Sequence, residues 1–200
     1  MYEFTDKAIE RINRVIQHEF SLVRQTVLSF DEIYVIQNAV NDAYATIYNA
    51  VKKIYLEVAN DAYKAVTERD TMFTALWIEQ FLRGYDPVTK YVFDHEFDRK
   101  RARLFEALVA SKKKDIPYEL KQAMYNLAVQ TKQYADEVTD TATLQGYKDS
   151  GIARVTWVTE QDGRVCSECK SRSGKTYAVD KVPAKPHIRC RCYLLPTRTT

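Results

Sequence analysis

The chain has 200 residues, of which 46% are hydrophobic and 28% are charged, a composition ordinary for a soluble protein with a packed core. No stretch approaches the ~18 consecutive apolar residues of a membrane-spanning helix, and the N-terminus lacks the apolar segment of a secretory signal. Both observations favour a cytosolic, reducing setting. The net charge of +3 is unevenly distributed, because residues from Arg154 onward hold ten Lys/Arg against four Asp/Glu, whereas the preceding residues hold 20 against 23.

Two long helices are predicted at the start of the chain. Thr5 can cap the first, and apolar residues follow it at steps of three and four up to Val27. Ser29 and Glu32 have the spacing of a capping box, which predicts that the second helix starts there. Its apolar period continues to Val66, so this helix would run ~38 residues, or ~57 Å. A compact domain of this size cannot cover such a helix, so we expect it to project, to pair with another long helix or to pack against a partner.

Three further helices follow in the helical part of the chain. A short apolar helix is predicted over residues 72–82. Asp86-Pro87 is a helix-start signature, so the next helix should run from there to about Ser111. Pro117 then opens a last helix that ends within residues 146–151.

The pattern changes near residue 150, where four of the five glycines follow from position 146 onward and apolar residues begin to alternate. Short strands are predicted over 153–161, 175–179 and 192–196. The sequence therefore predicts an α+β protein in two parts: a helical bundle over residues 1–150 with a long projecting helix, and a small antiparallel β module over 151–200. Three short strands bury little core, so the module needs another source of stability.

All four cysteines lie in this module, as two pairs with one histidine between them: Cys166, Cys169, His187, Cys190 and Cys192. A C-x-x-C pair can occupy two vertices of a tetrahedral metal site. Cysteines two apart on a strand point the same way and can reach the same ion. We therefore predict a structural zinc site held by the four cysteines, with His187 as the substitute ligand or as a hydrogen-bond partner of a thiolate. The ion would supply the folding energy that the small module lacks.

Three other uses of these residues stay open. A thioredoxin-type redox pair begins a helix in a βαβ unit, whereas this C-x-x-C pair is predicted in a turn between strands. Two disulfides would suit an exported or virion-borne protein. A catalytic zinc needs an open coordination position, and four or five soft ligands close the site. The sequence holds no glycine-rich phosphate loop and no G-x-S-x-G motif.

The basic balance of the module suggests an anionic partner, nucleic acid above all, although a simply lysine-rich surface would give the same count. The candidate phosphate contacts are Lys170, Arg172, Lys175, Lys185, Arg189 and Arg191.

Several residues of the module follow one another at fixed spacings: Trp157, Asp162, Cys166, Cys169, Gly174, Tyr177, His187, Cys190, Cys192 and Pro196. This order resembles the C-terminal module of the MuF-like minor head proteins of tailed bacteriophages, also called phage head morphogenesis proteins. In the family pattern a proline follows the histidine, whereas here Pro186 precedes it. The helical part resembles the family only in kind, as long helices that lead into the module.

The resemblance implies a non-enzymatic virion component that acts in head assembly inside the capsid, and in the host cytoplasm while heads assemble. Its expected partners are the portal protein, the major capsid protein and, in some members, packaged double-stranded DNA, with no membrane and no small-molecule substrate. The competing class is a cellular zinc-ribbon protein that binds nucleic acid. A third class is a zinc-dependent enzyme such as a nuclease.

Overall fold

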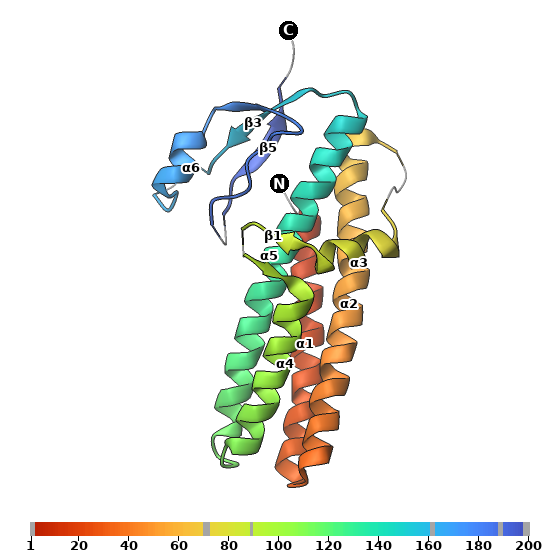
Figure 1. Ribbon diagram of the computed structural model, residues 1–200, viewed down its shortest axis with the longest axis vertical. Helices are drawn as coiled ribbons and strands as arrows, with labels where there is room; N and C mark the ends of the chain where they lie inside the picture. Colours follow the sequence, from red (N-terminus) through yellow and green to blue (C-terminus); the bar gives the residue numbers. More distant parts are fainter. Residues whose placement is uncertain (1–2, 70–72, 89, 161–162, 188–189, 198–200) are drawn as a thin grey trace.

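The computed structural model describes residues 3–69, 73–88, 90–160, 163–187 and 190–197. Four long helices form an antiparallel bundle: α1 (Glu3–Ser29), α2 (Ile33–Thr67), α4 (Phe93–Ala110) and α5 (Ile116–Asp149). The chain then leaves the bundle at one end and forms a small β module there, with the connections between α1 and α2 and between α4 and α5 at the opposite end (Figure 1). The protein is therefore α+β, as the sequence predicts. Among the described residues, no helix combines the length and the apolarity needed to cross a membrane.

Helix α2 is buried along most of its length, from Ile36 to Tyr63. It packs against α1, α4 and α5, and α5, at 34 residues, is nearly as long as the 35 residues of α2. The expectation that this helix projects is therefore wrong, and pairing with another long helix is what is observed. Gly146 of α5 packs tightly against α2, because an added Cβ there would overlap Cγ2 of Val66.

Two predicted helix starts differ from the structure. Ser29 is the last residue of α1, and Glu32 is the N-cap of α2 without a side-chain hydrogen bond, so the capping box is not formed. Asp86 opens a tight turn instead of a helix, because its carboxylate accepts a hydrogen bond from the Val88 amide at 2.8 Å. This turn joins two short strands, β1 (Tyr85–Asp86) and β2 (Tyr91–Val92). The helix starts at Phe93, six residues after the predicted first helical residue Pro87, and the side chain of Phe93 is fully buried.

The remaining helix of the bundle region, α3 (Ala75–Arg83), is the short apolar helix that the sequence predicts. Thr74 caps it, since its side chain accepts a hydrogen bond from the Trp77 amide.

The β module is a three-stranded antiparallel sheet with one short helix. β3 (Arg154–Val158) lies between β4 (Thr176–Ala178) and β5 (Tyr193–Pro196), and α6 (Ser167–Arg172) lies between β3 and β4 in the chain. Val155 and Trp157 alternate inward from β3 and are buried, as the period of two predicts. On α5 the Tyr147 hydroxyl donates a hydrogen bond to the Leu194 carbonyl of β5, which ties the module to the bundle.

Candidate metal centre

The first cysteine pair is positioned by helix α6. Cys166 is the N-cap of this helix, and its Sγ accepts a hydrogen bond from the Cys169 amide at 3.3 Å. Cys169 lies in the first turn and is buried. The prediction of a plain turn here is therefore wrong, which removes one of the arguments against a redox pair. The other argument stands, because the sheet is antiparallel and the helix is not the crossover of a βαβ unit.

The second pair comes directly before β5. Cys190 and Cys192 are buried while Arg191 between them is exposed, so the two thiols face the same side of the chain. They lie in the segment that leads into the strand, not within the strand itself. The alternation that the sequence predicts is nevertheless kept, because the extended backbone continues ahead of the first ladder hydrogen bonds.

All five predicted ligands converge on one place. The potential ligand atoms of Cys166, Cys169 and His187 lie within 4.8 Å of one another, and so do those of Cys169, Cys190 and Cys192. Cys169 belongs to both groups and stands at the centre of the cluster. Its Sγ lies 3.5 Å from Sγ of Cys190 and 3.4 Å from Nε2 of His187.

These separations fit one tetrahedral ion. With metal–sulfur bonds of ~2.3 Å and metal–nitrogen bonds of ~2.0 Å, two ligand atoms of a tetrahedron lie ~3.5–3.8 Å apart. The 3.5 Å between Cys169 and Cys190 is far longer than a disulfide bond, and all four thiols are free. The donor set can therefore hold a metal ion, and it offers five ligands for four positions.

The thiols differ in how readily they ionise. Burial raises the pKa of Cys190 to about 11 and raises the pKa of Cys169 strongly. Cys166 differs, because the hydrogen bond from the Cys169 backbone amide lowers its pKa to about 7. A divalent ion bound here would displace the protons of the buried thiols, so its affinity would rise with pH.

A small pocket adjoins the cluster. It is lined in part by Cys166, Cys169 and His187, and its volume of about 20 Å³ is enough for about one water molecule. The cysteines and the histidine therefore fill most of the space around the cluster.

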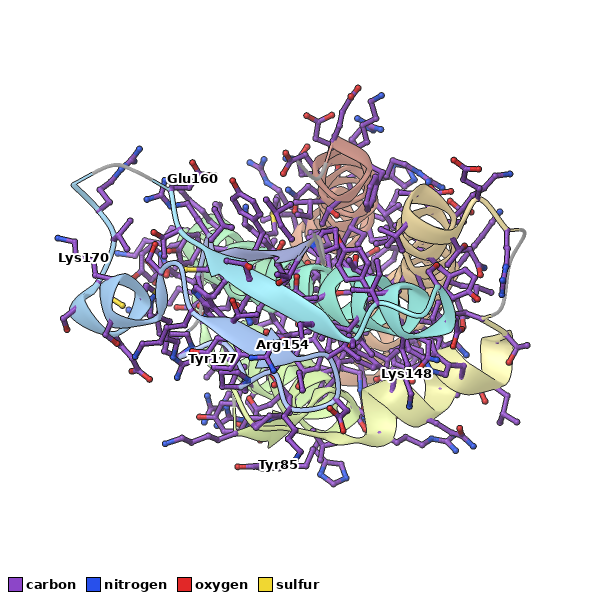
Figure 2. The ribbon with its side chains drawn as sticks, turned by 90° about the horizontal axis from the view of Figure 1, so that it is seen from above. Tyr85, Lys148, Arg154, Glu160, Lys170 and Tyr177 are labelled. Atoms are coloured by element: carbon purple, nitrogen blue, oxygen red, sulfur yellow. The ribbon has the colours of Figure 1, made fainter. Side chains whose placement is uncertain are left out.

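The predicted phosphate contacts divide into three groups. Lys170 and Lys175 are exposed, and Figure 2 shows Lys170 on the outer side of α6, pointing away from the bundle. Arg191 is also exposed, whereas Arg189 lies outside the described residues. The remaining two, Arg172 and Lys185, are engaged within the protein.

Arg172 links several parts of the β module through its own contacts. Its guanidinium lies 5.1 Å from the centre of the Trp157 ring and donates hydrogen bonds to the Ala184 carbonyl and to Glu168, both at 2.6 Å. The side chain is 18% exposed. These contacts hold the guanidinium on the chain's own groups, which makes Arg172 a weaker candidate for a phosphate contact than the exposed cations.

Lys185 forms a buried ion pair that the sequence reading missed. Its Nζ lies 2.6 Å from Oδ2 of Asp140 on α5, with side chains only 9% and 14% exposed. Because this ion pair already satisfies its charge, Lys185 is a weak candidate for a phosphate contact. Although burial acts to lower it, the charge of Asp140 and the hydrogen bond to it raise the pKa of Lys185.

Further carboxyl groups of α5 surround this pair. Burial raises the pKa of Asp136 to about 6, and burial together with the charge of Asp140 raises the pKa of Glu137 to about 8. A cavity of about 210 Å³ lies beside them, between α5, β3 and β5. The sequence feature that could have indicated this acidic group is the four-residue spacing of Asp136 and Asp140, because it places both carboxyl groups on one helix face.

Comparison with known proteins gives no relative. No family model matches the chain, and neither the curated proteins nor the solved structures contain a significant match.

Proposed function

We propose that the cysteine cluster binds one structural zinc ion. The observation that carries this proposal is the convergence of four thiols and one imidazole in two groups that share Cys169, with separations of 3.4 and 3.5 Å from its Sγ to His187 and Cys190. Thiolate and imidazole ligands select zinc among the common divalent ions, and an ion held by four protein ligands is structural. The ion joins α6 to the segment before β5, two parts of the chain that no strand pairing connects directly.

We further propose that the chain is a non-enzymatic minor head protein of a tailed bacteriophage. The support is the resemblance of its residue spacings to the MuF-like module, together with the cysteine cluster and the long-helix body. In this proposal the helical body docks on the portal or capsid interior, and the module faces packaged DNA. Three of the candidate DNA contacts are exposed, Lys170, Lys175 and Arg191, and Arg189 remains a candidate outside the described residues.

The DNA contact is tested by binding of the full-length, zinc-loaded chain to double-stranded DNA of unrelated sequences at several salt concentrations. The proposal expects little sequence preference and an affinity that falls steeply with salt. Replacing both Lys170 and Lys175 by Ala should lower the salt slope by ~2. The matched control is Lys148→Ala, which removes an exposed cation far from α6 (Figure 2). A flat salt response would remove the DNA contact from the proposal.

The virion assignment is tested by genomic context and by particle composition. The proposal expects terminase and portal genes beside the gene for this chain, and expects mass spectrometry to detect the chain in purified DNA-filled heads. A cellular zinc-ribbon regulator, the second candidate, would instead bind DNA or RNA with sequence preference and would be absent from particles. Detection of the chain only in the cell fraction would overturn the virion assignment.

A further inference from the structure

The end of the bundle far from the β module brings two helix connections together. The α1–α2 and α4–α5 connections lie side by side there (Figure 1). An ion pair joins them, with Nζ of Lys113 2.9 Å from Oδ1 of Asp31. The two connections therefore form one continuous end surface, which we call the tip.

The tip exposes large apolar side chains. Six of them lie in the connections or within three residues of a helix end, and they are 39–66% exposed: Leu28, Phe30, Ile33, Tyr34, Val109 and Tyr118. The neighbouring residues Val27, Ile36, Leu108, Ile116 and Leu120 already fill the bundle core beneath. The core of the monomer therefore forms without the six exposed side chains.

The exposed apolar area is that of an interface. Three aromatic side chains of ~200 Å², half to two-thirds exposed, together with the three aliphatic ones, present on the order of 500 Å². This is at the upper end of the largest apolar patch on an ordinary monomer. Two such patches placed face to face would bury on the order of 1,000 Å², the lower bound for a specific protein interface, before any contribution from the charged rim.

The charges of the tip are arranged in two opposite halves. The α1–α2 connection carries Asp31 and Glu32. The α4–α5 connection carries the exposed run Lys112, Lys113 and Lys114 followed by the exposed Asp115, so it stays basic with a net charge of +2. Within the described residues only Asp31 and Lys113 are paired across the tip, and Glu32, Lys112 and Lys114 form no ion pair. A twofold rotation at the tip places the acidic half of one copy opposite the basic half of the other, so the surface is complementary to itself.

We propose that the tip is a homodimer interface, in which a second copy of this chain covers the apolar patch by a twofold axis across the bundle end. Phe30, Ile33 and Tyr34 of one copy then face the α4–α5 connection of the other, and Glu32 faces the lysine run. The two β modules lie at opposite ends of the dimer, with both candidate metal centres free. This inference does not depend on the proposed function.

The test is the solution mass of the full-length chain, loaded with zinc and kept reduced, measured by sedimentation velocity between about 1 and 200 µM. We expect a concentration-dependent shift from the 23.3 kDa monomer to twice that mass. Tyr34→Asp should raise the dimer dissociation constant at least tenfold. The matched control is Leu76→Asp, because Leu76 is 62% exposed on α3, away from the tip, and Tyr34 is 66% exposed. Circular dichroism verifies that both variants keep their helices.

A charge exchange separates this interface from other modes of association. Glu32→Lys alone and the pair Lys112→Glu with Lys114→Glu alone should each weaken the dimer several-fold at low salt. Combining all three substitutions in one chain should restore it, because each contact then regains an opposite charge. A chain that stays monomeric over the whole range, or a dimer that Tyr34→Asp leaves unchanged, would overturn the proposal and leave the tip to a different protein partner.

Discussion

Removing the metal should unfold the β module and leave the helical bundle intact. The perturbation is chelation of the zinc-loaded chain in the presence of reductant. Cys169→Ser is a milder perturbation. It removes the ligand that belongs to both groups, whose Sγ lies 3.5 Å from Cys190 and 3.4 Å from His187, but it leaves four other candidate ligands. The substitution should therefore weaken ion binding, whereas chelation removes every link that the ion makes between α6 and the segment before β5.

The size of the effect follows from the composition of the module's core. The buried side chains there are Tyr147, Val155, Trp157, Cys169, Cys190, Cys192 and Leu194. The four that are not cysteines contribute ~1.5–3 kcal/mol each by burial, together ~6–12 kcal/mol. A structural zinc ion in a small domain contributes ~10–16 kcal/mol. The ion therefore contributes more than half of the favourable free energy that offsets the loss of chain entropy on folding. Without the ion, the module should not stay folded.

The assay follows the fluorescence of Trp157, which is 2% exposed, in a Trp77→Phe background that removes the chain's other tryptophan. Chelation should shift the emission to the red, while ellipticity at 222 nm changes little because α6 is only six residues long. Reductant alone, without chelator, is the control for disulfides. A Trp157 spectrum that stays unchanged in metal-free protein with reduced thiols would refute the reasoning.

Four further outcomes follow from contacts elsewhere. Gly146→Val should destabilise the chain by ~1–3 kcal/mol in chemical denaturation, because its side chain overlaps α2, whereas Gly163→Ala, which meets no atom within 4 Å, should not. Glu68→Gly should stabilise it by ~1 kcal/mol, because Glu68 ends α2 with a left-handed φ of 57°. Glu137 has a pKa of about 8 against an ordinary 4.5, so the folded state holds its proton more tightly and stability should fall as pH rises from 4.5 to 8. In denaturation curves measured over this pH range, the free energy of unfolding should fall by an amount on the order of 3 kcal/mol, and Glu137→Gln should abolish this fall. If the same pH dependence persists in the variant, the raised pKa of Glu137 is contradicted. Lys185→Met should destabilise by ~3 kcal/mol at pH 8, less at pH 5, where the carboxyl groups around it can take up protons.

Periodicity predicted the helices well because it is a local property of the chain. The stripe on α2 located that helix to within a few residues of Ile33–Thr67. The apolar stripe shows that one face of the helix must be buried, but it does not identify the segment that buries it. For this reason the prediction of a projecting helix was wrong. Helices α1 and α5 cover most of that face, and α5 packs tightly against α2 at Gly146, a residue that the sequence presents only as a possible helix end.

A local sequence signature gave a wrong prediction where it is compatible with two different structures. Asp86-Pro87 begins either a helix or a turn, and distant contacts decide between them. Here the turn holds, with the Tyr134 hydroxyl of α5 donating to the Tyr91 carbonyl of β2 and with Phe93 buried directly behind it. Neither contact is readable from residues 85–93 alone.

The same contrast separates the two kinds of site residue. The cysteine cluster was predictable because ligand spacing within each pair is local, and two pairs with one histidine have few other ways to be satisfied. Lys185 was not predictable, because its partner Asp140 lies 45 positions earlier and belongs to the other part of the chain. An exposed lysine and a buried, paired lysine look alike in a sequence.

The position of Lys185 also explains why the bundle should survive loss of the module. Lys185 lies two residues before His187, so one short segment contributes both to the metal centre and to the ion pair with Asp140. When the ion leaves, that segment is released, and the cavity that adjoins Asp140 and Glu137 opens to water. The carboxyl groups of α5 are then hydrated instead of stranded without a cation, which avoids the cost of an unpaired buried charge. The contacts of α5 with α1, α2 and α4 do not involve this segment, so the bundle can lose the module and remain folded.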